Sequence, residues 1–408
     1  MASLLLLFGA GDAALLGRLL AAATTSTAGR RARLPGRVVI DAHVAMSTPS
    51  ISKMARHAGT GLIIDPQTLY LQDWQHQGDP WARLPFATHH LQMVSDLLDV
   101  HRADRLVAET LEFQLHHGAT TLMAPYVHVE RPGDGWAQVQ ALLYRRTRRY
   151  LDAQRLHLPI LAPVALSWKL VSRTSWPAAL DGLIDALRIL APDEVALAAS
   201  KIDQGAHPDL RLAGLYATIG HLRRHWPVIA WQQGILGEAC VAAGAAGYES
   251  GIGWRERCDL RTRMAGHRST SSKDGGGPLR PVYIAALGRS IPKKTVLAAL
   301  TDPVAGPQLI CMDPHCCPTG RLVLTGDARA HAITARAARL SRLDSAEHPR
   351  WMWQNVAQHA ISAVELAQRI NRIAAAQPGT QQIDTSALQA VAVTADVRRQ
   401  TANRQHIA

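Results

Sequence analysis

Short apolar runs separated by helix-length segments recur along most of this chain, and this alternation constrains the fold more than any other feature. Runs that are apolar on both faces and joined by helical crossovers are typical of parallel strands buried between layers. Their number and spacing predict an α/β fold, a (β/α)8 TIM-like barrel, with a doubly wound sheet as the alternative. The eight runs are Val38–Asp41, Gly61–Asp65, Thr120–Tyr126, Ile160–Leu166, Glu194–Ala199, Val228–Gln232, Ala246–Ser250 and Val282–Leu287.

The pattern changes on both sides of the predicted barrel. Residues 2–23 are rich in Leu and Ala but lack the basic start of a signal peptide, so we expect an amphipathic helix. After the last run come a Cys-rich loop, a short hairpin at Arg321–Thr325, and long helices near 328–343 and 348–375. The Gly/Ser-rich segment 266–278 predicts a lid or an inert surface loop.

These patterns divide the chain into four predicted parts. Residues 1–36 form an N-terminal helical segment, and 37–305 form the barrel. Residues 306–375 form an appended zinc-binding and helical subdomain, and 376–408 form a polar tail that we expect to be frayed. No other segment approaches the ~18 uninterrupted apolar residues of a membrane span, so we expect a cytoplasmic protein without a membrane partner.

Three of the five cysteines lie between Cys311 and Cys317. Cysteines this close together, in a chain without a spread-out cysteine framework, indicate a metal site rather than disulfides. A structural Zn²⁺ takes four tetrahedral sulfur or nitrogen ligands, which Cys311, Cys316, Cys317 and one downstream histidine would supply. His331 and His348 both follow the loop. The alternative is three buried cysteines without a metal.

Basic residues outnumber acidic ones, with 44 Lys and Arg against 32 Asp and Glu and a net charge of +12. Most of the basic residues are Arg, whose planar fork matches a phosphate, so the chain predicts a nucleic-acid partner. A GC-rich genome would produce the same excess. Trp74 and Trp81 lie in a polar loop and are candidates for stacking on bases, although burial is the commoner fate of a tryptophan.

Polar side chains follow several of the predicted strands, at the end of a barrel where chemistry takes place. Asp65 and Glu249 each end an apolar strand, and two carboxyl groups across a barrel mouth have the pairing that glycosyl transfer requires. Gln232 and Asp203 end two other strands and are predicted to contact the substrate. Arg255, six residues past Glu249, is predicted to hold a phosphate bidentately.

One stretch resembles a known family. Residues 234–255 read GILGEACVAAGAAGYESGIGWR, a Gly-led, Ala-rich helix followed by a strand that ends in Tyr-Glu-Ser and then an Arg. This is similar to the region of tRNA-guanine transglycosylases, including their DNA-modifying relatives, in which the strand ends in Phe-Asp-Cys. The resemblance places Glu249 at the position of the family's nucleophile and Asp65 near its early base-side Asp. In that family a zinc site of three Cys and one His follows the barrel, which implies His348 as the fourth ligand and His331 as the alternative.

The resemblance implies a pentosyltransferase that exchanges a base in tRNA or DNA and carries a structural Zn²⁺; the sequence leaves a homodimer open. The chain departs from the family in three places. Glu replaces the nucleophilic Asp, Cys-x4-Cys-Cys replaces Cys-x-Cys-x-x-Cys, and the Ser-Gly-Gly-Phe-Gln that follows the early Asp is absent. Two alternatives therefore remain: a catalytically inactive, zinc-stabilised barrel that binds nucleic acid or a protein, and an unrelated barrel hydrolase.

Overall fold

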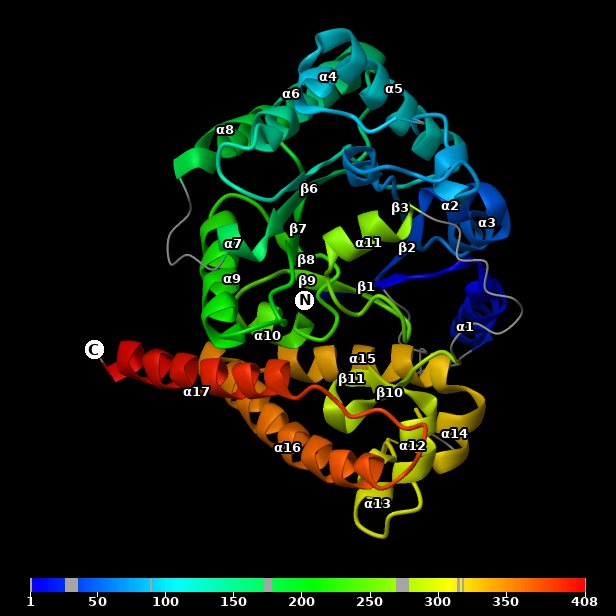
Figure 1. Ribbon diagram of the computed structural model, residues 1–408, viewed down its shortest axis with the longest axis vertical. Helices are drawn as coiled ribbons and strands as arrows, with labels where there is room; N and C mark the ends of the chain where they lie inside the picture. The colour runs from blue at the N-terminus through cyan, green and yellow to red at the C-terminus, as the bar shows by residue number, and fades with distance from the viewer. Residues whose placement is uncertain are drawn as a thin grey trace.

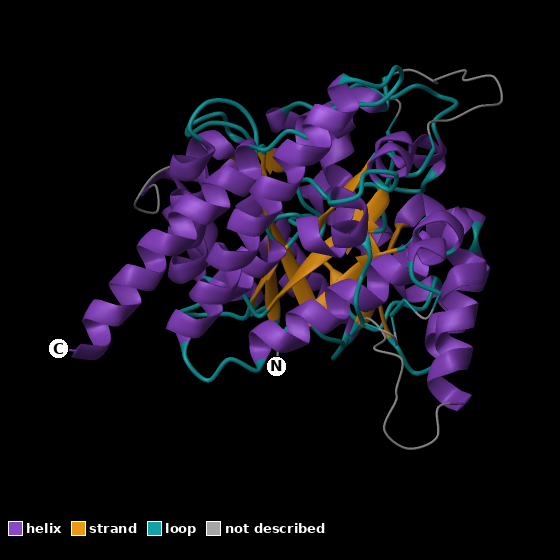
Figure 2. Ribbon diagram, turned by 90° about the horizontal axis from the view of Figure 1, so that it is seen from below, coloured by secondary structure: helices purple, strands orange, loops and turns teal. Residues whose placement is uncertain are grey.

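The computed structural model describes residues 2–25, 36–88, 90–171, 178–268, 279–313, 316–317 and 319–407. Residues 269–278, which form most of the predicted lid or loop, lie outside these ranges. Figure 1 shows a barrel with a helical subdomain beneath it, and Figure 2 shows the strands inside a layer of helices.

The predicted (β/α)8 barrel is confirmed. Parallel strands form one sheet in the order β3-β2-β1-β9-β8-β7-β6-β4, and β5 pairs with β6 beyond the end of β4, so β4 and β5 share one of eight positions. A parallel bridge between Ile63 and Thr121 joins β3 to the start of β4 and closes the ring, which excludes an open doubly wound sheet. The strands are β1 (Ser3–Leu7), β2 (Arg37–Asp41), β3 (Gly61–Asp65), β4 (Leu122–Met123), β5 (His128–Val129), β6 (Ile160–Ser167), β7 (Glu194–Ser200), β8 (Val228–Ala230) and β9 (Gly247–Gly251).

Helices follow the strands, and most of them cover the outside of the barrel, as crossovers between parallel strands require; α11 (Leu260–Gly266), after β9, lies across the barrel mouth instead. Their apolar stripes pack against strands that are buried on both faces, so helices and strands share one continuous core. The helices are α1 (Ala13–Thr25), α2 (Ala42–Ser47), α3 (Pro49–His57), α4 (Val94–Leu98), α5 (Val100–His116), α6 (Trp136–Gln154), α7 (Trp168–Val171), α8 (Asp181–Leu190), α9 (Pro208–Leu222), α10 (Gly237–Ala242) and α11 (Leu260–Gly266). Short 3-10 turns are η1 (Ala10–Asp12), η2 (Thr68–Gln72), η3 (Pro80–Arg83), η4 (Ala178–Leu180) and η5 (Ala285–Leu287).

The first barrel strand is β1, so the prediction of a helix from the start of the chain was wrong over these residues. β1 lies between β2 and β9 and is parallel to both, with its Leu residues buried on both faces. A short apolar run of this kind fits a buried strand and a helix equally well, which is why periodicity did not separate them. The helix begins only at Ala13.

The last predicted barrel strand was also wrong. β10 (Val282–Ile284) pairs antiparallel with β11 (Arg289–Ile291) in a separate two-stranded sheet. This sheet belongs to a second hydrophobic core, which lies in the subdomain with α12 (Lys293–Ala299), α13 (Ala305–Leu309) and part of α16 (Pro349–Ala375).

Two of the predictions for the subdomain were confirmed and two were wrong. The long helices are present as α15 (Ala328–Asp344) and α16. The expected hairpin is a short helix, α14 (Arg321–Gly326). The expected frayed tail contains α17 (Ser386–Ile407), which packs on α16 and α9. Its small apolar residues Ala387, Val391 and Ala395 recur every four positions and form one buried stripe.

Helix α15 joins the subdomain to the barrel. Near its start, the Arg329 guanidinium lies 2.8 Å from the buried carboxylate of Asp12, just past the end of β1. At its end, the Asp344 carboxylate accepts a hydrogen bond of 2.9 Å from the backbone N of Ala2. The helix therefore runs along β1 on the outside of the barrel. Among the described helices, none is long and apolar enough to cross a membrane.

Candidate active site and metal centre

Backbone strain gathers at the ends of the barrel strands. Four residues other than Gly that have a positive φ follow β3, β7, β8 and β9: Gln67 (53°), Lys201 (61°), Gln232 (60°) and Arg255 (58°). A side chain in this left-handed region costs free energy, and such residues cluster where a fold fixes polar groups for function. The C-terminal mouth of the barrel is therefore the first place to look for an active site.

The two predicted catalytic carboxyl groups, Asp65 and Glu249, both lie in the barrel mouth with 1% exposure. The pKa of Glu249 is raised to about 8, mainly by burial; Arg255 and Arg263 oppose this rise, and the nearby Asp65 adds to it. Burial also raises the pKa of Asp65 to about 6, against the opposing effects of Arg255 and of hydrogen bonds from Gln67 N and Tyr126 OH. At neutral pH the pair therefore holds one carboxylate and one carboxylic acid.

The hydrogen bonds of Glu249 leave one oxygen available. Its Oε2 accepts from the backbone N of Gln232 at 2.9 Å, which the left-handed backbone of Gln232 makes possible. Its Oε1 is buried and has no hydrogen-bond partner in the described part of the chain. An unpartnered buried oxygen costs free energy, so it is a candidate for contact with a ligand.

An ion pair between Arg255 and Asp41 also lies in the barrel mouth. The Arg255 guanidinium pairs with the carboxylate of Asp41, at the end of β2, and Asp41 also accepts from Gln67 Nε2 at 2.9 Å. Arg255, for which a phosphate contact was predicted, is a partner of Asp41 in this structure. Asp41 ends a predicted strand just as Asp65 does, so the same reasoning could have found it.

Helix α11 and the turns on both sides of it span the mouth and cover the carboxyl pair. On one side, the backbone N of Leu260 donates to Ser200 Oγ at the end of β7. On the other side, His267 Nδ1 lies 2.7 Å from Asp79 Oδ2, in the loops that follow β3. Between them, the positive charge of Arg263 lowers the pKa of Glu249, so this guanidinium lies near the carboxyl pair.

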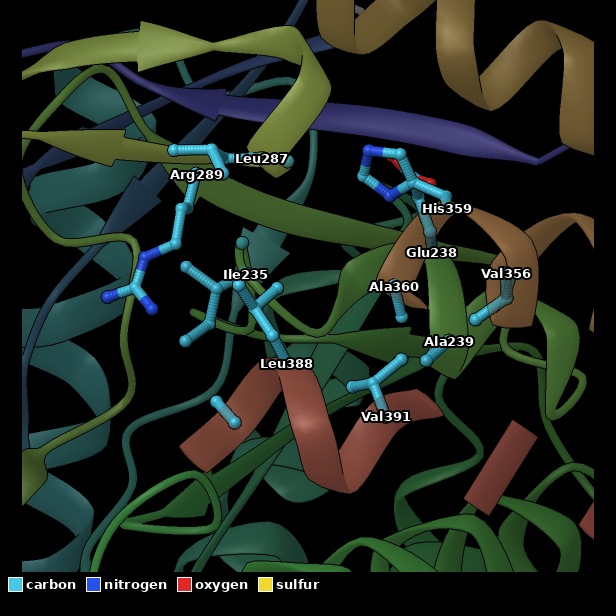
Figure 3. A pocket seen from close by; sticks show the side chains of 13 residues that line it. Ile235, Glu238, Ala239, Leu287, Arg289, Val356, His359, Ala360, Leu388 and Val391 are labelled. Atoms are coloured by element: carbon cyan, nitrogen blue, oxygen red, sulfur yellow. The ribbon is translucent and has the colours of Figure 1, made fainter. Parts of the chain in front are cut away.

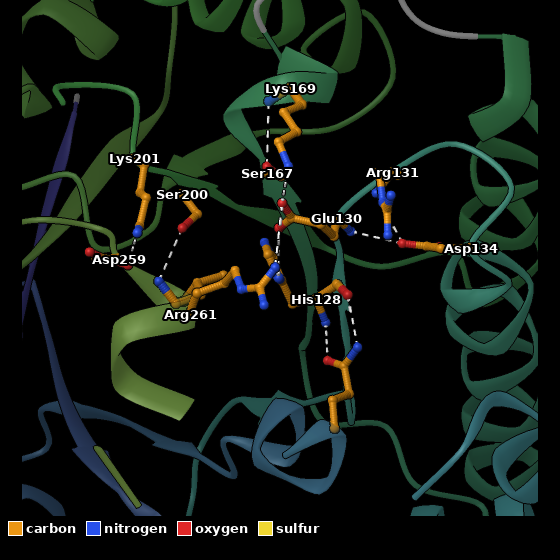
Figure 4. Close-up of polar contacts among 12 residues, drawn as sticks. His128, Glu130, Arg131, Asp134, Ser167, Lys169, Ser200, Lys201, Asp259 and Arg261 are labelled. Atoms are coloured by element: carbon orange, nitrogen blue, oxygen red, sulfur yellow. Dashed lines mark hydrogen bonds and ion pairs between the residues drawn. The ribbon is translucent and has the colours of Figure 1, made fainter. Parts of the chain in front are cut away.

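A cleft of about 660 Å³ opens beside α11, between this helix and the loop after β5. Three arginines, Arg131, Arg261 and Arg268, line it together with Leu91 and Trp136. Figure 4 shows the side chains around Glu130, which lies between Lys169 and Arg261 at 2.7 and 3.7 Å. The cleft is therefore lined by charged groups of both signs, with guanidinium groups exposed to solvent.

His128 lies on the wall of this cleft. It is 3% exposed, and burial lowers its pKa to about 4, so the ring is neutral at neutral pH. Its Nδ1 lies 3.9 Å from Glu130 Oε2, while its Nε2 is buried and has no hydrogen-bond partner within the described ranges.

The remaining predicted substrate contacts are separated from one another. Gln232 is beside Glu249, as described above. Asp203 lies in another cluster, where the Arg257 guanidinium is 2.9 Å from its carboxylate. Of the two candidate stacking tryptophans, Trp74 is 54% exposed, whereas Trp81 is fully buried and donates its Nε1–H to Pro66 O, so Trp81 cannot stack on a base.

The Cys-rich loop and α15 bring together a potential metal site. The ligand atoms of Cys311, Cys316, Cys317 and His331 all lie within 4.8 Å of one another. His331 Nδ1 is 3.2 Å from both the Cys316 and the Cys317 sulfur, and those two sulfurs are 4.0 Å apart. Three thiols and an imidazole are the donor set of a tetrahedral metal site, and the spacing fits one ion between them.

His348, the ligand that the family resemblance implied, is not in this group. It is the N-cap residue of α16, where its Nδ1 accepts a hydrogen bond of 3.1 Å from the backbone N of Arg350. The alternative, His331, is 1% exposed and faces the cysteines from the first turn of α15. Because α15 places His331 beside the three cysteines, His331 and not His348 is the fourth candidate ligand.

A smaller cavity lies between the barrel and the last helices (Figure 3). Its volume is about 40 Å³, and most of its lining is apolar, from α10, η5, α16 and α17. Glu238, Arg289 and His359 contribute the polar groups. This space is too small for a substrate and is a packing gap between two parts of the fold.

The chain has no match among family models or among curated proteins. Among solved structures it is similar to a thiamine phosphate pyrophosphorylase from Pyrococcus furiosus (10% identity, TM-score 0.31, 65% of this chain and 94% of that one). A GH18 chitinase from Pseudoalteromonas aurantia gives 10% identity and a TM-score of 0.38 over 65% of this chain and 100% of that one. Dihydrodipicolinate synthase from Oceanobacillus iheyensis gives 8% identity and a TM-score of 0.32 over 98% and 97%. At these TM-scores the similarities carry no functional argument, and none of the three is a tRNA-guanine transglycosylase.

Proposed function

We propose that this protein is a glycosyl-transfer enzyme that exchanges a base in tRNA or DNA, with Asp65 and Glu249 as its catalytic pair. The observation that carries the proposal is the presence of two buried carboxyl groups in the barrel mouth, each 1% exposed and each with its pKa raised by burial, to about 6 for Asp65 and about 8 for Glu249. Paired carboxyl groups, one ionised and one protonated, are what displacement at an anomeric carbon needs.

The pKa order assigns the roles in the opposite sense to the family resemblance. Asp65 is the carboxylate at neutral pH, so it attacks the anomeric carbon while the bond from that carbon to the base nitrogen breaks. Glu249 gives its proton to the departing base. The incoming base then returns a proton to Glu249 as its nitrogen displaces Asp65, which regenerates both groups.

The arginine-lined cleft beside α11 supports a nucleic-acid substrate. Exposed Arg131 and Arg261 line it together with Arg268, which is paired with Asp73, and with the carboxyl groups of Glu130 and Asp134; the whole chain has a net charge of +12. Guanidinium groups bind phosphates bidentately, and this contribution weakens as salt rises. Because Asp65 and Glu249 are 1% exposed, a bound nucleotide reaches them only when α11 moves off the mouth.

We infer that the metal at the cysteine cluster is a structural Zn²⁺. With Zn–S bonds of about 2.3 Å, two thiolates on one tetrahedral ion lie about 3.8 Å apart, close to the separation of the Cys316 and Cys317 sulfurs. The four ligands Cys311, Cys316, Cys317 and His331 leave no open position for substrate. The ion would hold the loop to α15, and no chemical step involves it.

The test is incorporation of labelled guanine or 7-deazaguanine into tRNA and, separately, into duplex DNA. The wild-type protein should incorporate label, and Asp65→Asn and Glu249→Gln should each reduce the rate at least ~10³-fold, since neither amide can act as nucleophile or acid. Glu109→Gln, on the outer helix α5, is the control and should retain the wild-type rate.

Withholding the incoming base separates the two carboxyl groups. A covalent adduct between the nucleic acid and the peptide that contains Asp65 would support the assigned roles. An adduct on the peptide that contains Glu249 would restore the roles that the family resemblance implies.

A second candidate function is a barrel that binds nucleic acid without catalysis. The complete burial of both carboxyl groups beneath α11 favours this alternative, because carboxyl groups that no substrate reaches take part in no reaction. Binding of tRNA or DNA without any incorporation of label would contradict the proposed base exchange and would support a non-catalytic nucleic-acid-binding protein.

A further inference from the structure

We propose that Arg336 is a positioning residue that clamps the two loops holding Glu249, and that the metal centre keeps this clamp in place through helix α15. The candidate catalytic pair would then depend on an ion that never contacts the substrate. The inference rests on the proposed function only in calling Asp65 and Glu249 catalytic; the structural coupling stands by itself.

Helix α15 connects the metal cluster to the residues that hold the barrel mouth. His331, in its first turn, contributes the imidazole of the metal cluster, and Arg336 lies five residues further along. At a rise of about 1.5 Å per residue, the two side chains leave the helix about 7.5 Å apart along its axis. A regular helix over this length is stiff, so a shift at His331 moves Arg336 with it.

The Arg336 guanidinium contacts two loops of the barrel mouth. Its side chain is 2% exposed, and its Nη2 lies 2.6 Å from the carboxylate of Glu256, in the loop after β9. Its Nη1 donates a hydrogen bond of 2.9 Å to the carbonyl of Gly234, in the loop after β8. Its guanidinium also lies over the Tyr283 ring at 4.2 Å. One guanidinium therefore joins two neighbouring loops of the barrel mouth.

These two loops contain residues that act on Glu249. The loop after β8 contains Gln232, whose backbone N donates to Glu249, and the loop after β9 contains Arg255, next to Glu256. Both Gln232 and Arg255 have a left-handed backbone, with φ of 60° and 58°. Such conformations persist only when surrounding contacts fix them, and the Arg336 clamp is one of these contacts.

The loops also contact each other directly, which makes the clamp a single unit. The backbone N of Ile235 donates to the carbonyl of Glu256 at 3.1 Å. The Glu256 carboxylate further accepts from Ser290 N and Ser290 Oγ at 2.8 and 2.7 Å. Loss of Arg336 would remove the side-chain hydrogen bond to the Gly234 carbonyl and would leave the Glu256 carboxylate with Ser290 as its hydrogen-bond partner.

Helix α15 provides a matched control. Arg339, three residues after Arg336, pairs with Glu238 on α10 and donates to the carbonyl of Ala285. It makes an ion pair of the same kind on the same helix but touches neither mouth loop. A general weakening of the contact between α15 and the barrel would therefore follow from either substitution, whereas a positioning effect would follow from one alone.

The experiment titrates Glu249 in the full-length, metal-loaded protein labelled with ¹³C at the Glu side-chain carboxyl carbons. The Glu249 resonance is assigned by its loss in Glu249→Gln. The charged groups that act on Glu249 are Arg255, Arg263 and Asp65, and a displaced Arg255 withdraws a cation that favours the carboxylate. Arg336→Lys keeps the charge but cannot bridge two acceptors in the same way, so the pKa of Glu249 should rise by about half a unit or more.

Three comparisons decide the proposal. Arg339→Lys should leave the pKa of Glu249 as in wild type. Removal of the metal from wild-type protein by a chelator should raise the pKa of Glu249 as Arg336→Lys does. Addition of Zn²⁺ should restore the wild-type pKa. An unchanged titration in folded Arg336→Lys protein would overturn the clamp. An unchanged titration in metal-free protein would overturn the link to the metal, and this arm needs no variant that might fail to fold. None of these readouts involves base exchange, so a failure of the proposed function is seen separately.

Discussion

The barrel mouth and the cysteine cluster hold their polar groups by different means. In the mouth, Asp41, Asp65 and Glu249 lie on parallel strands of a closed ring, and each accepts a contact from another protein group: Arg255, Tyr126 OH and the backbone N of Gln232, respectively. In the cluster, three thiols lie on a short loop in which Met312 is 87% exposed, and only His331 comes from a long helix. The core of the fold organises the mouth, whereas the cluster depends on a bound ion for its geometry.

The largest effect should come from the metal ligand on α15. His331→Ala should remove nearly all bound metal, as measured by elemental analysis of the purified protein. The free energy of unfolding of the loop and α15 should fall by several kcal/mol, because structural Zn²⁺ sites contribute roughly 10 kcal/mol or more. Hydrogen exchange localises that loss. If the barrel mouth stays protected while the cluster and α15 open, the mouth is organised without the metal, which would contradict the proposed link through Arg336.

His348→Ala is the matched control for this prediction. His348 caps α16, so its substitution should leave metal content unchanged and cost about 1 kcal/mol of stability. Loss of metal from His348→Ala, with full metal in His331→Ala, would show that the family's ligand arrangement applies after all.

An intermediate effect should come from the buried carboxyl pair, and it depends on pH. The pKa of each group is raised on folding, from 3.8 to about 6 for Asp65 and from 4.5 to about 8 for Glu249. A carboxyl group with a raised pKa contributes its full stability below the unfolded value and loses it as the pH rises through the folded value. Stability of the wild-type protein should therefore decline between about pH 4 and pH 8.

The double variant Asp65→Asn, Glu249→Gln lacks this dependence. In urea unfolding at pH 8 it should be more stable than wild type by a few kcal/mol, since each unit of pKa shift corresponds to about 1.4 kcal/mol. At pH 4 the two proteins should differ little. A wild-type protein that is equally stable at both pH values would mean that the mouth is open to water in solution.

The smallest effect should come from Trp74, at the rim of the mouth. Trp74→Ala should weaken binding of single-stranded nucleic acid roughly tenfold, because stacking of a base on an aromatic ring contributes about 1–3 kcal/mol. The melting temperature should not change, since the ring is 54% exposed. Trp351→Ala, on α16, removes a ring that is 44% exposed on the subdomain and should leave binding unaltered. Equal losses in both variants would mean that nucleic acid is not confined to the mouth.

The barrel could be predicted from the sequence because most of its strands are apolar on both faces and are separated by helix-length segments. The same signal misled at the two ends of the ring. Ser3–Leu7 has the composition of a helix, and Val282–Ile284 has that of a barrel strand. Which run fills the last position depends on pairing with Gly247–Gly251, a long-range contact that local pattern does not contain.

The candidate site shows the same division. Asp65 and Glu249 could be placed in the mouth because parallel strands all end on one side of a barrel. The pairing of Arg255 with Asp41 could not be predicted, because it joins residues that are 214 positions apart and depends on the path of the loop after β9. The three cysteines were recognisable from their spacing, but the choice of His331 over His348 depends on how α15 crosses the loop.

The position of β1 has a consequence for biosynthesis. Ser3–Leu7 must pair with Gly247–Gly251, which the ribosome makes much later than β1. Until then a strand of consecutive leucines has an unpaired edge, the kind of segment that associates with other chains or recruits chaperones. The nascent barrel can close only after β9 emerges, so conditions that slow translation between β2 and β9 should prolong the exposure of β1 and favour aggregation over folding.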